Sequence, residues 1–280
     1  MMESIFDAIR TIYAKLGRGE KKVADALLKD ANVIVGMSIN ELAEYCGCGD
    51  ATIIRFARRL GLNGYQALKI RIFQEKNYSP EMSVQATAED DCFDIWKKYK
   101  TAITSMMDNT EKVLSSRALE NAADAILKAP RIAIFGTGQS GAIALALQHS
   151  FMYIGLNVTA HTDGHLQMIS AANLSKKDVA IGISLSGCSI DIVEALTVAK
   201  EHSATTIAFT KDGITMIDNV SDIKLCVASD NDNRPFSGRL NRIIQLSIVE
   251  ALSSYLVLRK GSQAEEARLN SRKAVERKMF

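Results

Sequence analysis

Apolar residues recur every three to four positions over the first quarter of the chain, which is the period of amphipathic α-helices. Helices are predicted over residues 5–16, where Gly17 and Gly19 follow, and over residues 20–28. Three more are predicted over residues 39–46, 50–60 and about 65–76. This part of the chain is therefore predicted to be all-α.

Two of these helices form a pair with well-marked ends. Ser38-Ile-Asn-Glu41 has the spacing of a capping box, so it opens a helix. That helix stops at Gly47-Cys-Gly49, and the next begins at about Asp50. Two short helices joined by a glycine turn form a candidate helix-turn-helix, whose second helix enters the major groove of DNA.

The second helix of this pair has a polar face. Thr52, Arg55 and Arg59 share it at helical spacing, so they are expected to meet base edges or phosphates, with Arg58 and Lys69 near the DNA backbone. The full set expected to contact double-stranded DNA is Ser38, Thr52, Arg55, Arg58, Arg59 and Lys69. The alternative is a plain helical hairpin with a cationic, solvated face.

The composition changes after residue 76. Residues 77–91 are polar, contain Pro80 and end in acidic residues, which is typical of a linker. Amphipathic helices are predicted beyond it, over residues 93–114 and 117–128. The predicted domains are a helix-turn-helix domain over residues 1–77, a linker over residues 78–91 and a second domain over residues 92–280.

The apolar period changes again after Pro130. Short apolar runs separated by helical segments are predicted to be strands, over residues 132–135, 157–160, 178–184, 205–209 and 223–227. This alternation predicts an α/β domain of three layers, a parallel sheet flanked by helices as in flavodoxin-like folds. In such sheets ligands bind at the carboxyl ends of the strands.

Hydroxyl side chains follow two of these strands. Ser140 comes after the first, and Ser184, Ser186 and Ser189 come after the third, so the two loops are expected to converge on one anion such as a phosphate. The alternative is that these serines cap helices and satisfy turns. No GKS or GKT sequence follows the glycine loop, and we expect neither an ATP site nor a dinucleotide site, and no cofactor.

Composition places the chain among ordinary soluble proteins. Hydrophobic residues make up 47%, no apolar run is long enough to cross a membrane, and no secretory signal is visible. Five cysteines without a CxxC pair suit reduced thiols, so a cytoplasmic location is expected. Lys and Arg outnumber Asp and Glu by 12 to 9 over residues 1–77, a modest excess that coincides with the candidate helix-turn-helix.

A family resemblance covers most of residues 4–76. Ser38-Ile-Asn-Glu-Leu-Ala and Ala51-Thr-Ile-Ile-Arg-Phe-Ala-Arg-Arg-Leu-Gly-Leu-Asn-Gly-Tyr-Gln-Ala-Leu-Lys69 resemble the DNA-binding domain of the RpiR-type bacterial regulators. Where these proteins usually have a serine before the recognition helix, this chain has Gly49. Glycine caps a helix less well than serine by about 0.3 kcal/mol, so the fold is expected to persist with one hydroxyl fewer for a phosphate.

Residues 131–229 resemble the sugar isomerase (SIS) domain, whose loops bind phosphosugars. The resemblance rests on Gly136-Thr-Gly-Gln-Ser140 and on Ser184-Leu-Ser-Gly-Cys-Ser189, in which Ser189 replaces the threonine of the usual SxSGxT. It implies at least a dimer, either a homodimer or a homotetramer. The residues expected to bind a phosphosugar are Thr137, Gly138, Gln139, Ser140, Ser184, Ser186, Gly187, Cys188, Ser189, His165 and Glu250.

The two resemblances together predict a transcriptional regulator of sugar or amino-sugar metabolism. A phosphosugar effector would modulate its binding to operator DNA. Two alternatives remain: a sugar-phosphate isomerase with a helical appendage, for which His149, His165 or Glu250 would be the base, and a ligand-binding module whose helices contact protein. We favour a regulator with no catalytic residue and no metal site, because Asp163-Gly164 interrupts the pair His161 and His165.

Overall fold

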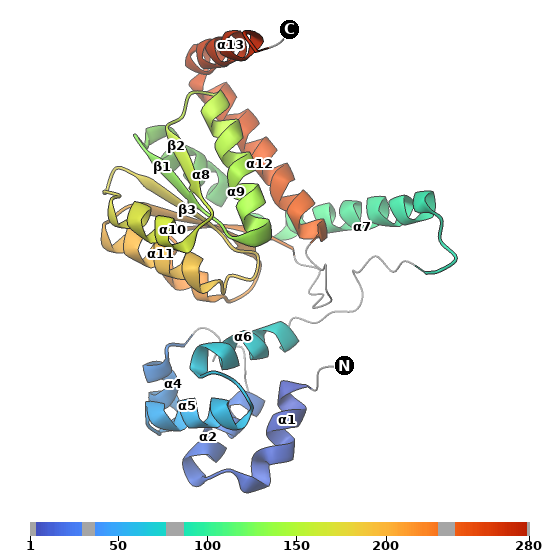
Figure 1. Ribbon diagram of the computed structural model, residues 1–280, viewed down its shortest axis with the longest axis vertical. Coiled ribbons are helices and arrows are strands. Elements are labelled where there is room, and N and C mark those ends of the chain that lie inside the picture. Colours follow the sequence, from blue (N-terminus) through green and yellow to red (C-terminus); the bar gives the residue numbers. More distant parts are fainter. Residues whose placement is uncertain (1–3, 30–36, 77–86, 229–238, 279–280) are drawn as a thin grey trace. The chain divides into compact units, whose positions relative to one another are not determined.

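The computed structural model describes residues 4–29, 37–76, 87–228 and 239–278 of the chain (Figure 1). The chain divides into two compact units, one drawn mainly from residues 1–80 and the other mainly from residues 81–280. Most of the predicted linker, residues 78–86, lies outside the described residues. In the described part of the chain, no helix is long and apolar enough to cross a membrane.

The first unit is helical, as the sequence predicts. Its elements are α1 (Ile5–Ile12), a short 3₁₀ turn (Tyr13–Lys15), α2 (Arg18–Lys29), α4 (Ile39–Cys46), α5 (Asp50–Arg59) and α6 (Tyr65–Lys76). Apolar residues at helical spacing bury one side of each helix, and Ile9, Leu27, Leu42, Phe56 and Leu68 are fully buried. α2 packs against both helices of the predicted helix-turn-helix.

The start of α2 differs from the prediction. The sequence suggested Glu20, whereas the helix begins at Arg18. The backbone N–H of Gly17 donates to Glu20 Oε2 at 2.8 Å, and Lys21 N–H donates to the carbonyl of Gly17 at 2.9 Å. A carboxylate in the first turn of the helix thus satisfies the N–H just before it, so the helical run breaks at Gly17 as predicted and the next helix starts directly after that residue.

The helix-turn-helix is confirmed in its details. Ser38 Oγ accepts from Glu41 N–H and Glu41 Oε2 accepts from Ser38 N–H, which completes the capping box of α4. Gly47 ends α4 with a φ of 57°, a left-handed conformation that favours glycine. Gly49 precedes α5 and offers no side chain to cap it.

The second unit has the α/β architecture that alternating strands and helices predict. Two helices precede the sheet, α7 (Cys92–Val113) and α8 (Ser116–Lys128). The strands are β1 (Ile132–Phe135), β2 (Val158–His161), β3 (Val179–Ile183), β4 (Thr205–Lys211) and β5 (Ile223–Val227). The later helices are α9 (Gly138–Tyr153), α10 (Gly164–Ala172), α11 (Ile190–Glu201), a 3₁₀ helix (Met216–Val220), α12 (Arg239–Lys260) and α13 (Ser262–Glu276).

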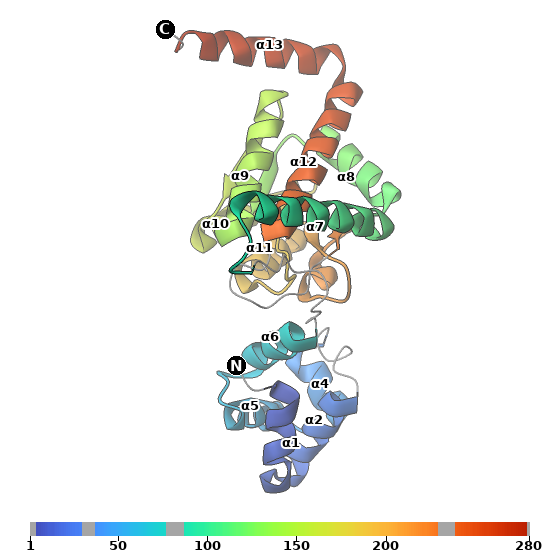
Figure 2. The same ribbon diagram turned by 90° about the vertical axis from the view of Figure 1, so that its right-hand side faces the viewer.

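The five strands form one parallel sheet in the order β2-β1-β3-β4-β5. Helices α7, α8, α9 and α12 bury one face of the sheet, and α10 and α11 cover the other (Figures 1 and 2). The predicted three-layer fold is therefore confirmed. The chain leaves β1 for β2 on one side and returns to β3 on the other, so the topological switch point lies between β1 and β3.

The start of α9 also differs from the prediction. Residues 136–140 were expected to form a loop, but α9 begins at Gly138, so Gln139 and Ser140 lie in its first turn. Glycine at 136 permits this early start because a Cβ there would lie 2.6 Å from the carbonyl oxygen of Ser140. The glycines that suggested a loop are instead the residues that let the helix approach the strand closely.

Replacing Gly49 with serine tests the capping of α5. Gly49 has a φ of −93°, and no atom lies within 4 Å of a Cβ built there, so a side chain fits without strain. We expect Gly49→Ser to raise the free energy of unfolding of the helical unit by about 0.3 kcal/mol and the matched Gly49→Ala to lower it. Urea denaturation of both variants and of the native chain measures these free energies of unfolding. Equal values for all three would contradict the inference that α5 lacks a side-chain cap.

Candidate functional site

The two hydroxyl loops leave the sheet side by side at the switch point. In the β1–β3 register Phe135 pairs with Gly182, so Thr137 and Ser184, each two residues further on, emerge from adjacent strands. Neighbouring strands lie about 4.8 Å apart. The loop that follows β1 and the loop that follows β3 therefore border the same small region at the carboxyl edge of the sheet.

The second loop, residues 184–189, forms a cluster of hydroxyl groups. Ser184 is only 1% exposed, and its hydroxyl donates to Ser189 Oγ at 3.0 Å. Ser186 is exposed, and its Oγ accepts from Cys188 N–H at 3.2 Å. Gly187 has a φ of 66°, which lets the loop fold back so that the hydroxyls converge.

Two helices begin at these loops. Thr137 is the N-cap of α9 and Ser189 is the N-cap of α11, and neither side chain makes a capping hydrogen bond. The N–H groups of the first turn of each helix therefore have no side-chain cap, and helix dipoles add positive potential there. Two helix N-termini beside a hydroxyl cluster can hold an anion such as a phosphate.

A lysine that the sequence analysis did not select lies beside the second loop. Lys211 ends β4 and is 5% exposed, and its backbone N–H donates to the carbonyl of Leu185 at 3.1 Å. Burial lowers the pKa of its ammonium group to about 8, and the nearby Cys188 opposes this shift. The sequence signal was a lysine that closes an apolar strand, but the strand had been predicted to end at Phe209.

The first loop has the spacing of a dinucleotide-binding loop, because Gly136, Gly138 and Gly141 fit GxGxxG. Spacing therefore does not exclude a dinucleotide. In such sites an acidic residue about 20 positions further on binds the ribose. Here the carboxylate at that place, Asp163, accepts from Leu166 N–H at 3.0 Å and caps α10. That the chain binds no dinucleotide remains a prediction. It now rests on Asp163, whose carboxylate caps α10 in place of binding a ribose.

The other two predicted ligand residues lie differently. His165 is exposed in the first turn of α10, and its neighbour Gly164 lies against the Asp191 carboxyl group at the start of α11, so His165 is near the second loop. Glu250 instead accepts from Ser150 Oγ at 3.4 Å. Ser150 is ten residues beyond Ser140 on α9, about 15 Å along the axis, so Glu250 is not brought to the hydroxyl loops of its own chain.

Among the described residues, no three His, Cys, Asp or Glu side chains gather as metal ligands would. His161 and His165, which were considered as metal ligands and set aside, lie at the end of β2 and at the start of α10.

In the helical unit, the two arginines predicted to meet DNA share a buried carboxylate. Glu20 is 2% exposed, and its Oε1 accepts from Arg55 Nε at 3.2 Å and from Arg59 Nε at 3.0 Å. Both arginine side chains remain substantially exposed, 64% for Arg55 and 48% for Arg59. Because each uses its Nε for Glu20, the terminal nitrogens are left toward the surface of α5, and Arg59 Nη1 also donates to the Lys15 carbonyl.

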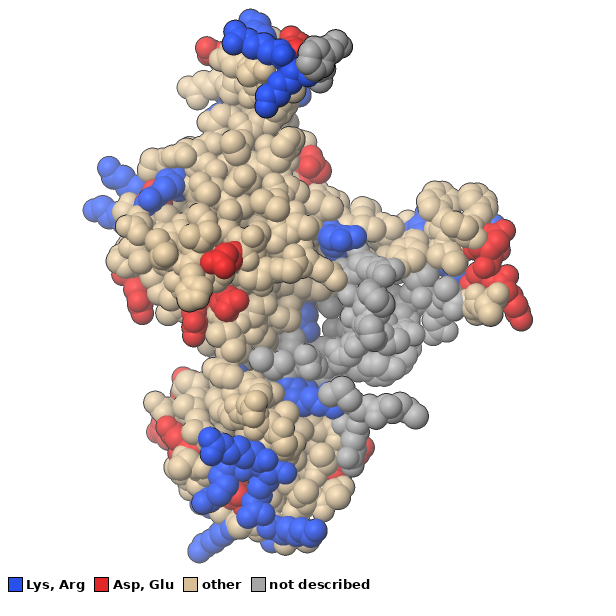
Figure 3. All heavy atoms as spheres, viewed as in Figure 1, with Lys and Arg blue, Asp and Glu red and all other residues tan. Residues whose placement is uncertain are grey.

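The charge of Glu20 is maintained despite its burial. Burial alone would raise the pKa of this carboxyl group, but the N–H of Gly17 and the guanidinium groups of Arg59 and Arg55 lower the pKa below its usual value. Lys and Arg side chains gather on the face of the helical unit over α2 and α5 (Figure 3). Glu20 thus orients two cations within a basic surface.

The remaining residues predicted to contact DNA lie in different surroundings. Arg58 is exposed near the end of α5, and Thr52 is half-buried against Gly19. The hydroxyl of Ser38 is used in the capping box. Lys69 is 4% exposed, and its ammonium donates to the carbonyl of Met37 at 2.7 Å, so it does not present a charge at the surface and we no longer include it.

Comparison with known proteins agrees with both units. A family model described as the helix-turn-helix domain of the rpiR family matches residues 4–79, and one described as the SIS domain matches residues 125–255. The HTH-type transcriptional regulator TTE0211 of Caldanaerobacter subterraneus subsp. tengcongensis is 36% identical over 252 residues, which are 90% of this chain and 89% of the relative. HexR of Pseudomonas aeruginosa, also an HTH-type transcriptional regulator, is 29% identical over 93% of this chain and 91% of its own.

A solved structure shares the fold over nearly the whole length. The NanR protein of Vibrio vulnificus, complexed with ManNAc-6P, matches 98% of this chain and 99% of its own with a TM-score of 0.72. The two sequences are 19% identical, so this likeness concerns the fold alone.

The buried lysine beside the hydroxyl loops predicts a dependence of stability on pH. The pKa of Lys211 is about 8 in the folded chain and about 10.4 for an unfolded lysine, so between these values the unfolded state binds more protons. The free energy of unfolding is expected to rise with pH over this window, by up to roughly 3 kcal/mol. Denaturant titrations at pH 7.5 and 10 measure this rise, which Lys211→Met should largely remove. An equal rise of the free energy of unfolding in the native chain and in Lys211→Met would show that other titrating groups cause it.

Proposed function

Because the chain belongs to the RpiR family of helix-turn-helix transcriptional regulators with a SIS domain, we propose that it binds operator DNA through α5 and a phosphosugar through the loops at the switch point. The effector would change the affinity for DNA by linkage, because it binds the DNA-competent and DNA-incompetent states unequally. The observation that carries the proposal is the meeting of two hydroxyl loops and two helix N-termini at one edge of the sheet.

The chemistry of this edge suits a phosphate ester. Backbone N–H groups of α9 and α11 and the hydroxyls of Ser186 and Ser189 are donors, Ser184 orients Ser189 by donating to its hydroxyl, and Lys211 can supply a positive charge from below. Binding of a dianion beside Lys211 would raise the pKa of the lysine and keep it charged. His165 and the first loop, residues 137–140, would contact the hydroxyl groups of the sugar.

The chemistry of α5 suits DNA. Arg55, Arg58 and Arg59 lie within ten residues of one helix, which follows a glycine turn as recognition helices do. Two such helices are needed to read two half-sites, and we therefore propose that the chain works as a dimer or a tetramer of its own kind.

The rival function is an aldose-ketose isomerase, which needs a base that reaches the carbon beside a carbonyl. Glu250 of α12 lies beside Ser150, too far along α9 from the hydroxyl loops of its own chain, and His165 is exposed and makes no hydrogen bond that orients it among the described residues, which favours the regulator. An assay of sugar-phosphate interconversion separates the two functions. Turnover at any pH would support the isomerase.

Ser184→Ala tests the effector site. The variant is expected to keep operator affinity and to lose the response to phosphosugars, because the buried hydroxyl that joins Ser184 to Ser189 is removed from the anion site. Fluorescence anisotropy of labelled operator DNA, titrated with a panel of phosphosugars, measures this. Ser254→Ala, an exposed serine of α12, is the matched control. A normal ligand response in Ser184→Ala would refute the pocket assignment.

Arg55→Ala tests the DNA-binding surface. The variant should lose about 1–3 kcal/mol of operator affinity if Arg55 contacts a base edge, or reduce the salt slope by about one if it contacts a phosphate. Arg10→Ala, which removes an exposed arginine paired with Asp7 on α1, is the control. Unchanged DNA binding in Arg55→Ala would favour helices that contact a protein.

Glu20→Gln tests whether operator binding depends on the orientation of Arg55 and Arg59 or only on the positive charge of this surface. The substitution adds one positive charge to the basic face, so non-specific DNA affinity should be kept or increase, whereas operator affinity should fall because the guanidinium groups lose their common anchor. Loss of both affinities would indicate misfolding of the helical unit, and circular dichroism of the variant checks this directly.

A further inference from the structure

Helix α7 carries an exposed aromatic pair far from the body of its own domain. Phe93 and Trp96 are 61% and 56% exposed, and their rings stack with centroids 5.5 Å apart. The N-terminal half of α7 extends away from the sheet (Figures 1 and 2). Of the 22 residues of α7, Met106 and Thr110 are the buried ones, and both belong to its C-terminal half.

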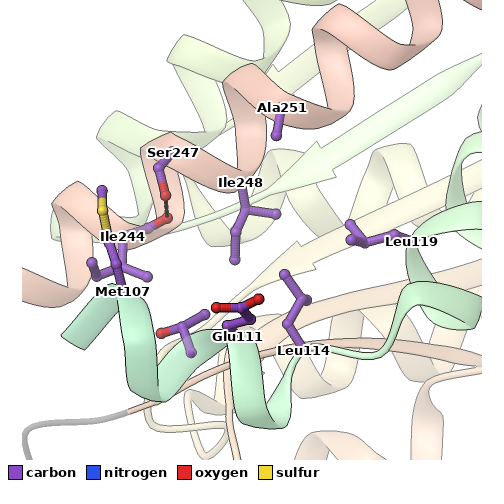
Figure 4. A pocket seen from close by; sticks show the side chains of 9 residues that line it. Met107, Glu111, Leu114, Leu119, Ile244, Ser247, Ile248 and Ala251 are labelled. Atoms are coloured by element: carbon purple, nitrogen blue, oxygen red, sulfur yellow. Dashed lines mark hydrogen bonds between the residues drawn. The ribbon is translucent and has the colours of Figure 1, made fainter. Parts of the chain in front are cut away.

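The C-terminal half of α7 borders an apolar hollow. Figure 4 shows side chains of α7, α8 and α12 that point into it, and its volume is about 250 Å³. The apolar residues that line it are Met107, Leu114, Leu119, Ile244, Ile248 and Ala251, and Glu111 lies at its side. Sites for small molecules usually measure about 300–1,000 Å³, so this hollow suits one large side chain better than a cofactor or a drug-sized ligand.

The aromatic pair and the hollow lie on the same side of α7. Phe93, Trp96, Met107 and Leu114 fall on one stripe at helical spacing. Trp96 and Thr110, which also lines the hollow, are fourteen residues apart, about 21 Å along the axis. A side chain cannot bridge that distance, so Trp96 cannot fill the hollow of its own chain.

We propose that two copies of this chain pair through antiparallel α7 helices, with Trp96 of each copy seated in the hollow of the other and Phe93 packed against its rim. Such an interface is isologous: the same knob and the same hole occur on both copies, and a two-fold axis brings each knob to a hole. This proposal rests on the dimer of the proposed function and specifies its interface. If the chain forms a dimer through another surface, this proposal fails while the proposed function stands.

The charges of α7 favour the antiparallel direction. On the side of the aromatic pair, Lys97 and Lys100 lie in the N-terminal half of α7, and Asp108 and Glu111 lie in its C-terminal half. Lys98 lies on the other side of the helix and is paired with Asp90 at 2.6 Å. In an antiparallel pair, the lysines of each copy lie opposite the carboxylates of the other copy, so the favourable contact occurs at two places. In a parallel pair, like charges would lie opposite one another. Lys97 also lies 2.8 Å from Asp94, but both side chains of this pair are exposed, so the pair competes weakly.

The area of the contact is adequate for a dimer. A buried aromatic side chain contributes about 150–250 Å², and since Phe93 and Trp96 are 61% and 56% exposed, the four rings of two copies can bury roughly 350–600 Å² more. The flanking stems of lysines and the walls of the two hollows bring the total near the lower end of stable interfaces, about 1,200 Å².

The single tryptophan of the chain reports directly on this contact. Trp96 emission should lie to the blue in the dimer, because the indole is enclosed, and should shift to the red on dilution to monomer. Ala251→Arg places a charge in the hollow and should shift Trp96 to the red at concentrations where the native chain is dimeric. Leu258→Arg, on the same helix at a residue that is 78% exposed, is the control and should leave the emission unchanged.

Cross-linking tests the register. If Trp96 lies opposite Thr110 of the partner, the exposed Cys92 lies opposite Leu114, so Leu114→Cys should form a covalent dimer under mild oxidation. The same variant with Cys92→Ser should not. A chain that sediments as a dimer, yet shows neither the cross-link nor a response of Trp96 to Ala251→Arg, would overturn the proposal. So would emission that stays blue in the monomer, because Trp96 would then be covered by its own chain.

Discussion

The parallel register of β1 and β3 is the constraint on which the candidate effector site depends. Because Phe135 pairs with Gly182, the two strands end at the same level and deliver residues 137–140 and 184–189 to the same edge. The sheet order then leaves this edge uncovered at the switch point, since the crossovers depart to opposite sides. A shift of the register by two residues would move one loop about 6.6 Å along the sheet and separate the groups that are proposed to hold one phosphate.

A second constraint of the same kind shapes the proposed DNA-binding surface. A carboxylate that is buried among helices costs free energy unless it is paired, and Glu20 is paired with two guanidinium groups and one backbone N–H. The same three contacts start α2 and orient Arg55 and Arg59 on α5. The stability of the helical unit and the geometry of its arginines therefore depend on one side chain.

Sequence predicted the elements well and their partners less well. The capping box of α4 and the strand β1 were predictable because capping and apolar runs are local signals. Gly138 was read as part of a loop, because the close approach of α9 to β1 that glycine permits is a tertiary property. Likewise, only the fold shows that Lys69 is buried against a carbonyl and that Lys211 lies beneath the second loop.

The central claim is that a phosphosugar at the switch point and operator DNA at α5 are energetically coupled. Such coupling is reciprocal: the factor by which the effector changes operator affinity must equal the factor by which the operator changes effector affinity. Isothermal titration of the phosphosugar, with and without saturating operator DNA, measures the second factor directly. The account predicts two effector affinities that differ by the factor found in DNA titrations. The same effector affinity with and without DNA would contradict it.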